Sequence, residues 1–151
     1  MDRKRKRMFS IVRGDLFGQH LSEGDAYMHC IARDLRMGKG IAAVFTQKFG
    51  RPAVPSEQKE QREPCVIVQP IVGGRFVLHI VTKALSKEKP SQANFTTALD
   101  MAFRDAVRLN VGHVYMPRIG SGLDRLDKDW VEHQVRQATA RHGVNTTMYE
   151  L

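Results

Sequence analysis

Residues 117–127 read PRIGSGLDRLD, and they predict a glycine-rich turn between the end of a strand and the start of a helix. The apolar residues Val114, Tyr115 and Met116 lead into this turn and are typical of a short buried strand. A helix pattern then opens at Asp127. A strand, a glycine-rich turn and a helix start in this order point backbone N–H groups at an anion.

Asp124 is the unusual residue of this loop, because a carboxylate opposes a backbone arrangement that suits phosphate. It is therefore either a solvated turn residue or the catalytic group that the loop positions. The glycines also have two interpretations, since Gly120 and Gly122 could supply only the positive φ angles of a turn. A single Gly-x-Gly is weak evidence for an anion site, so the rest of the chain must decide.

Length and composition indicate one soluble globular domain. With 151 residues, the chain can bury a core without disulfides or metals, and its 42% hydrophobic and 26% charged content is ordinary. The longest apolar run, from Ile41 to Phe45, is too short to cross a bilayer, and the N-terminus has no apolar segment of a secretory signal. We expect an intracellular protein, nuclear or cytoplasmic or both, with no membrane partner and a monomeric state.

The net charge of +8 is divided between the N-terminus and the body of the chain. Residues 1–7 hold five basic residues and one acidic residue, which is +4, and the other +4 belongs to residues 8–151. A mildly basic body suits an anionic ligand without naming it. Residues 1–8 are expected to form a basic disordered leader, either solvated or used for nuclear localisation or nucleic-acid contact. Residues 9–151 are expected to form the single domain.

Cysteine and histidine usage suggests neither disulfides nor a metal. Cys30 and Cys65 are the only cysteines, and nothing else suggests secretion, so reduced thiols are expected. The histidines form no ligand motif, and no metal or cofactor is expected; they stand at positions 20, 29, 79, 113, 133 and 142.

Apolar runs of strand length alternate with helical patterns along the chain. Strands are expected at residues 9–12, 26–31, 66–68, 76–81, 113–116 and 146–149, and helices at 40–48, 91–110 and 127–142. Residues 56–62 could form a further short exposed helix. Gly73-Gly74 joins two strands as a hairpin, which predicts an α/β fold with a mixed rather than purely parallel sheet.

The helices have recognisable faces and ends. Asp127 is a predicted cap, with Leu126 and Val131 as a hydrophobic staple. The predicted apolar face of helix 40–48 consists of Ile41, Val44, Phe45 and Phe49, with Gly50 as its stop. That of helix 91–110 consists of Phe95, Leu99, Ala102, Phe103, Ala106 and Val107, with Gly112 closing the helix.

Three segments lie where a predicted strand ends. They are Gly14-Asp15, Thr82-Lys83 and Met116-Pro117. In open α/β sheets, ligands bind at the carboxyl ends of the strands, so these segments could converge on one cleft.

Two side chains at these strand ends could carry chemistry. Lys83 follows an apolar strand, and burial favours the neutral, nucleophilic form of an amine. Its alternative is a lysine whose head reaches water. Asp124 could act beside it as general acid or base. Asp15 could accept a hydrogen bond from an exocyclic amine such as that of adenine, or could merely cap a turn.

Taken together, these segments resemble a macrodomain, and specifically the terminal ADP-ribose protein glycohydrolase branch. The matching segments are GDLF (14–17), HCI (29–31), RMGKGIA (36–42), KFG (48–50), TK (82–83) and PRIGSGLDRL (117–126), in the family's order and spacing. The resemblance implies a three-layer α/β/α macrodomain with a central mixed sheet that binds ADP-ribose.

The resemblance also implies the roles of the binding residues. Asp15 would bind the adenine amine, with Leu16 lining that pocket and Tyr149 and Leu151 flanking the ring. The residues around the diphosphate and distal ribose would be Ala32, Gly38, Gly40, Arg118, Ile119, Gly120, Ser121, Gly122 and Leu123. Members of the branch commonly carry serine at the position of Ala32 and an acid at that of Arg33, so a hydroxyl contact is expected to be lost here while a backbone contact survives.

The implied activity is hydrolysis of ADP-ribose from glutamate or aspartate, and deacylation of O-acyl-ADP-ribose. Lys83 would attack C1″ of the distal ribose, and Asp124 would transfer protons. The partners would be ADP-ribose and ADP-ribosylated proteins, with ADP-ribosylated nucleic acid as a further candidate. A non-catalytic ADP-ribose reader is the alternative, because one fold supports both functions. A basic nucleic-acid-binding domain is a third interpretation, based on the charge of +8.

Overall fold

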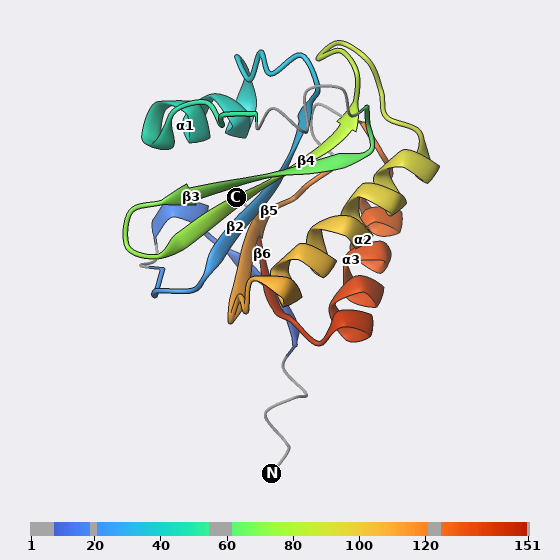
Figure 1. The fold of residues 1–151 in the computed structure, drawn as a ribbon. Helices are drawn as coiled ribbons and strands as arrows, with labels where there is room; N and C mark the ends of the chain where they lie inside the picture. Colours follow the sequence, from blue (N-terminus) through green and yellow to red (C-terminus); the bar gives the residue numbers. More distant parts are fainter. Residues whose placement is uncertain (1–7, 19–20, 55–61, 121–124, 151) are drawn as a thin grey trace.

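The computed structural model describes residues 8–18, 21–54, 62–120 and 125–150, which contain a six-stranded sheet (Figure 1). The strands are β1 (Phe9–Arg13), β2 (Ala26–Ala32), β3 (Cys65–Ile71), β4 (Arg75–Lys83), β5 (His113–Pro117) and β6 (Asn145–Glu150). Their order is β1-β6-β5-β2-β4-β3, in which all neighbours are parallel except the antiparallel pair β3 and β4. The predicted mixed sheet and its hairpin are confirmed.

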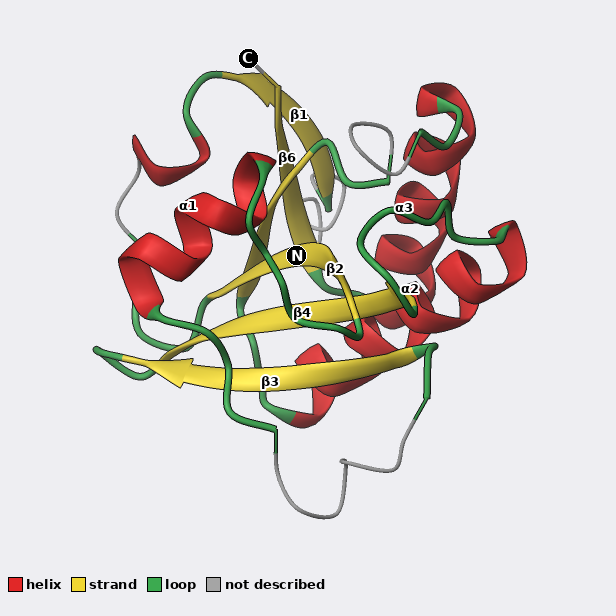
Figure 2. Ribbon diagram, turned by 90° about the horizontal axis from the view of Figure 1, so that it is seen from above, coloured by secondary structure: helices red, strands yellow, loops and turns green. Residues whose placement is uncertain are grey.

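Helices cover both faces of the sheet, so the molecule has three layers (Figures 1 and 2). Helix α1 (Gly40–Phe49) lies on one face, and α2 (Gln92–Arg108) and α3 (Lys128–His142) lie on the other. The larger core cluster lies between the sheet and the pair α2 and α3, whereas a smaller cluster around Phe45 lies under α1 and the short 3-10 helix η2 (Leu16–Gly18). Each helix thus buries one apolar face against the sheet.

The helix ends follow the local sequence, except at the end of α2. Asp127 caps α3 by accepting from the Trp130 N–H, and Gly143 ends it in the left-handed region, both as predicted. Helix α2 ends instead at Arg108, and the chain turns at Asn110 with φ +58° rather than at Gly112. Asparagine tolerates this conformation better than most residues, so Gly112 is not the stop.

The expected apolar faces are correct except at one residue in each of two helices. Val107 is 48% exposed because it lies at the solvent edge of α2, while the other five predicted residues of that face are buried. In α1, Ala42 rather than Val44 packs with Ile41, Phe45 and Phe49.

Cys30 and Cys65 are free thiols, as expected. The possible helix at 56–62 falls mainly on residues 55–61, which lie outside the described residues. Within the described ranges, no helix combines the length and the apolar character needed to span a bilayer.

Candidate active site at the carboxyl edge of the sheet

The strand order brings most of the predicted site residues to one edge of the sheet. Asp15 follows β1, Tyr149 lies near the end of β6, Arg118 follows β5, Ala32 ends β2, and Lys83 ends β4. Because these five strands are parallel, their carboxyl ends meet along the same edge. Four strand spacings of about 4.8 Å separate β1 from β4 by about 19 Å, which suits an extended ligand.

Lys83 is a buried lysine. Lys83 is 7% exposed, and the preceding strand residues Val81 and Thr82 are fully buried. The register places Lys83 opposite Ala32, after an irregularity between Ile31 and Ala32. A lysine whose head reaches bulk water would be much more exposed, so the solvated alternative does not fit.

The second glycine segment lies where the chain enters α1. Gly38 and Gly40 are both exposed, and Gly40 has φ +61°. Lys39 occupies the N-cap position of α1, and no side chain in the described part of the protein caps the helix there. The first N–H groups of α1 therefore retain the capacity to bind an anion.

The first residues after Arg118, Ile119 and Gly120, pack against the core. Ile119 is buried in the larger core cluster, and Gly120 has φ +76° with the Phe95 ring directly behind it. The Leu126 N–H donates to the Gly120 carbonyl over 2.7 Å and closes the loop. The predicted residues Ser121, Gly122, Leu123 and Asp124 lie outside the described residues, as does Leu151.

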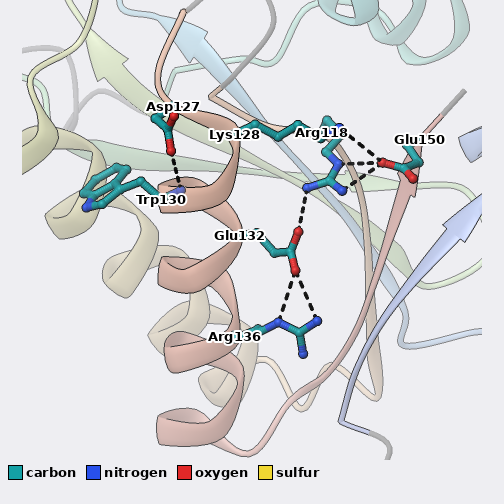
Figure 3. A network of polar contacts seen from close by, with 7 residues as sticks. All are labelled: Arg118, Asp127, Lys128, Trp130, Glu132, Arg136 and Glu150. Atoms are coloured by element: carbon teal, nitrogen blue, oxygen red, sulfur yellow. Dashed lines mark hydrogen bonds and ion pairs between the residues drawn. The ribbon is translucent and has the colours of Figure 1, made fainter.

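The Arg118 side chain is held by two carboxylates (Figure 3). Its Nη2 lies 2.8 Å from Glu150 Oε1, its Nε donates to the same oxygen, and its Nη1 lies 3.1 Å from Glu132 Oε1. Glu132 Oε2 also pairs with Arg136. Hydrogen bonds from Arg118 lower the pKa of both glutamates. Each of the three guanidinium nitrogens thus contacts a carboxylate oxygen.

The opposite end of the edge is built from Asp15, Leu16 and Tyr149. Asp15 Oδ1 accepts from the Phe17 N–H at 3.0 Å, so the predicted capping role is present on one carboxylate oxygen. Leu16 is buried in the smaller core cluster. The half-buried ring of Tyr149 lies 6.5 Å from that of Tyr115.

A buried polar chain that sequence patterns did not reveal connects the sheet to α1. Gln69 Nε2 donates to the carbonyls of Phe49 and Gly50, so its Oε1 accepts from His79 Nε2 at 2.7 Å. His79 Nδ1 then accepts from His29 Nε2 at 2.9 Å. His29 Nδ1 is left as a buried acceptor that has no partner among the described residues. These polar contacts fix the end of α1 to the edge strand β3 and, through it, to β4 and β2.

This histidine pair predicts that acid destabilises the protein. Burial lowers the pKa of His79 to about 3, and burial with the neighbouring His79 lowers the pKa of His29 well below the usual 6.5. As the pH falls below 6.5, the unfolded chain takes up protons that the folded protein excludes. His79 should therefore remove about 2 kcal/mol of unfolding free energy between pH 7 and pH 5, and His29 acts in the same direction.

Urea denaturation of His79→Gln at pH 7 and pH 5 checks this expectation. Glutamine retains a donor and an acceptor, and the variant should lose about 2 kcal/mol less than wild type over this interval. His133→Gln is the control, because His133 is exposed on α3. Equal losses in wild type and His79→Gln would contradict the role of the buried pair.

The three layers and the loop-lined carboxyl edge define the fold class of the Macro domain. A family model described as Macro domain matches residues 29–135, and the chain belongs to this family. Over 141 residues it is 33% identical to the ADP-ribose glycohydrolase OARD1 of Homo sapiens and to that of Bos taurus, covering 93% of this chain and 90% of each relative.

Solved structures agree on the fold. The macrodomain of Thermus aquaticus DarG has a TM-score of 0.78 at 21% identity, with 95% of this chain and 99% of that chain covered. The macrodomain of Mycobacterium tuberculosis DarG has a TM-score of 0.74 at 22% identity, with 93% and 97% covered.

Proposed function

We propose that this chain is an ADP-ribose glycohydrolase that removes ADP-ribose from glutamate or aspartate side chains and deacylates O-acyl-ADP-ribose. The observation that carries the proposal is the buried Lys83 at the carboxyl end of β4, on the edge shared by five parallel strands. Its 33% identical relatives are named ADP-ribose glycohydrolases, which supports this class of hydrolase.

The order of residues along the edge matches the order of groups in ADP-ribose. Asp15 and Tyr149 lie at one end, the backbone of residues 118–120 lies in the middle, and Lys83 lies near the other end. In the proposed binding mode, Asp15 accepts from the adenine amine through its second carboxylate oxygen. The loop after β5 and the start of α1 bind the diphosphate, and the distal ribose lies at Lys83.

The proposed reaction proceeds in two steps. The Lys83 amine attacks C1″ of the distal ribose, the C1″–O bond breaks, and the substrate carboxylate leaves with the bonding electrons. The amine loses a proton as its N–C1″ bond forms. Water then adds at C1″, the N–C1″ bond breaks, and ADP-ribose leaves with the lysine restored. Asp124 is proposed to transfer the protons.

The experiment that tests this function uses a protein that carries ADP-ribose on glutamate. We expect the wild-type chain to release ADP-ribose in a time course read by chromatography, and to bind free ADP-ribose in calorimetry. Binding without release above the buffer rate would instead establish a reader. Absence of both would remove ADP-ribose as the ligand. A matched substrate with ADP-ribose on a nucleic-acid phosphate tests the remaining candidate partner.

A further inference from the structure

The loop between β2 and α1 has an unusual backbone. Leu35 and Met37 have φ values of +55° and +47°, although neither is glycine. Such residues cost roughly 1–3 kcal/mol each and persist only where their surroundings determine the conformation. This loop carries the chain from Ala32, beside Lys83, to the exposed start of α1.

Asp34 attaches this loop to the segment that follows Lys83. Its Oδ1 accepts from the Ser86 hydroxyl at 2.8 Å and from the Arg36 N–H at 3.1 Å, and its Oδ2 accepts from the Ser86 N–H at 2.9 Å. Two backbone bonds run in parallel, from the Arg33 N–H to the Lys83 carbonyl and from the Asp34 N–H to the Ala84 carbonyl. Lys83 and the segment that follows it, Ala84 and Ser86, are therefore fixed to one loop.

Arg51, which follows the end of α1, binds the same loop. Its Nε donates to the Leu35 carbonyl at 3.0 Å and its Nη2 donates to the Arg36 carbonyl at 2.8 Å. Met37 is buried in the smaller core cluster. The carboxylate and the guanidinium together over-determine a strained backbone: Asp34 joins the loop to the segment after β4, and Arg51 joins it to the segment after α1.

We propose that Asp34 is a positioning residue for hydrolysis. By binding Ser86, Asp34 sets the position of Lys83 relative to the start of α1. This inference rests on the proposed function, because it assigns the placement of the proposed nucleophile. Asp34 is exposed and both of its oxygens are occupied by donors from the protein, so it has no direct part in the chemistry. Desolvation by neighbouring atoms raises the pKa of Asp34, but the hydrogen bonds from Ser86 and Arg36 lower it by more. The pKa of Asp34 is therefore below its usual value, and the carboxylate remains charged at neutral pH.

The test compares Asp34→Ala with Asp100→Ala. Asp100 is a matched control because it also accepts from three donors, Arg104, Arg141 and His142, but it joins α2 to α3. Both variants should be destabilised. Only Asp34→Ala should lower kcat, by about 10-fold with KM within about 2-fold, because a small displacement of a reacting group slows chemistry strongly.

A second readout does not require turnover. The rate at which acetic anhydride acetylates Lys83, measured by mass spectrometry, should rise about 5-fold or more in Asp34→Ala and stay unchanged in Asp100→Ala, because the segment after Lys83 is released. Ser86→Ala removes only the hydroxyl bond and should give a smaller effect than Asp34→Ala on both readouts. Should Asp34→Ala fail to fold, Asp34→Asn and Ser86→Ala carry the comparison.

The outcomes separate this proposal from the proposed function. An unchanged kcat in folded, active Asp34→Ala overturns the positioning role, whatever the acetylation rate. If wild type releases no ADP-ribose, the proposed function fails by itself. The acetylation rate then decides whether Asp34 places Lys83: an unchanged rate overturns the inference, and a raised rate supports the placement.

Discussion

Replacement of Lys83 by alanine is expected to lower kcat for release of ADP-ribose from glutamate by about 10³-fold or more. The reason is that the variant lacks the amine that attacks C1″, so the two-step route through a covalent intermediate is lost. Binding of free ADP-ribose should remain within a few-fold of wild type in calorimetry, because most of the proposed contacts come from backbone and from the other end of the edge.

Two further variants make the Lys83 result specific. Lys83→Arg keeps a positive charge but not a nucleophilic amine, so it should be as inactive as Lys83→Ala. Lys87→Ala removes an exposed lysine four residues further along and should keep wild-type activity. Activity of Lys83→Ala within a few-fold of wild type would exclude the lysine as nucleophile. In Asp124→Ala, mass spectrometry should detect ADP-ribose attached to Lys83 if Asp124 helps to release the adduct.

Gly120→Ala is expected to lower the melting temperature by about 4–16 °C. The residue has φ +76°, and a Cβ would lie 2.9 Å from a Phe95 ring carbon and 3.2 Å from Val131 Cγ2. The left-handed backbone costs about 1 kcal/mol and overpacking costs about 1–3 kcal/mol more. For a chain of this size, each kcal/mol corresponds to about 2–4 °C.

Gly143→Ala is the matched control, since Gly143 has φ +69° but nothing within 4 Å of its Cβ position. It should therefore lower the melting temperature by only about 2–4 °C. Gly120→Ala should also weaken ADP-ribose binding, because the displaced peptide belongs to the proposed diphosphate loop. Equal melting temperatures for the two variants would show that the loop moves away from Phe95 without cost.

Local patterns predicted the elements of this fold because the decisive signals are short. The cap at Asp127, the glycine at 143 and the hairpin at Gly73-Gly74 each act over a few residues. Boundaries were less certain where two residues compete for one role, as Asn110 and Gly112 do at the end of α2. The edge that collects Asp15, Arg118 and Lys83 followed from the alternation of strands and helices.

The polar partners within the site could not be predicted in the same way. Arg118 meets Glu132 and Glu150, which are 14 and 32 positions away, and Asp34 meets Ser86 across 52 positions. Such pairs depend on the strand order β1-β6-β5-β2-β4-β3, which no periodic pattern within one segment encodes. The predicted roles of Asp124 and of residues 121–123 remain predictions, because these residues lie outside the described ranges.

The ion pair between Glu150 and Arg118 has a practical consequence for handling the protein. Glu150 is the last residue that the structure describes, and its carboxylate supports the first residue of the loop after β5. An affinity tag fused directly behind residue 151 would crowd this ion pair and alter the loop in which ligand binding is measured. Tags and surface attachments belong ahead of β1, which begins at the amino edge of the parallel strands, opposite to the carboxyl edge that holds the candidate site.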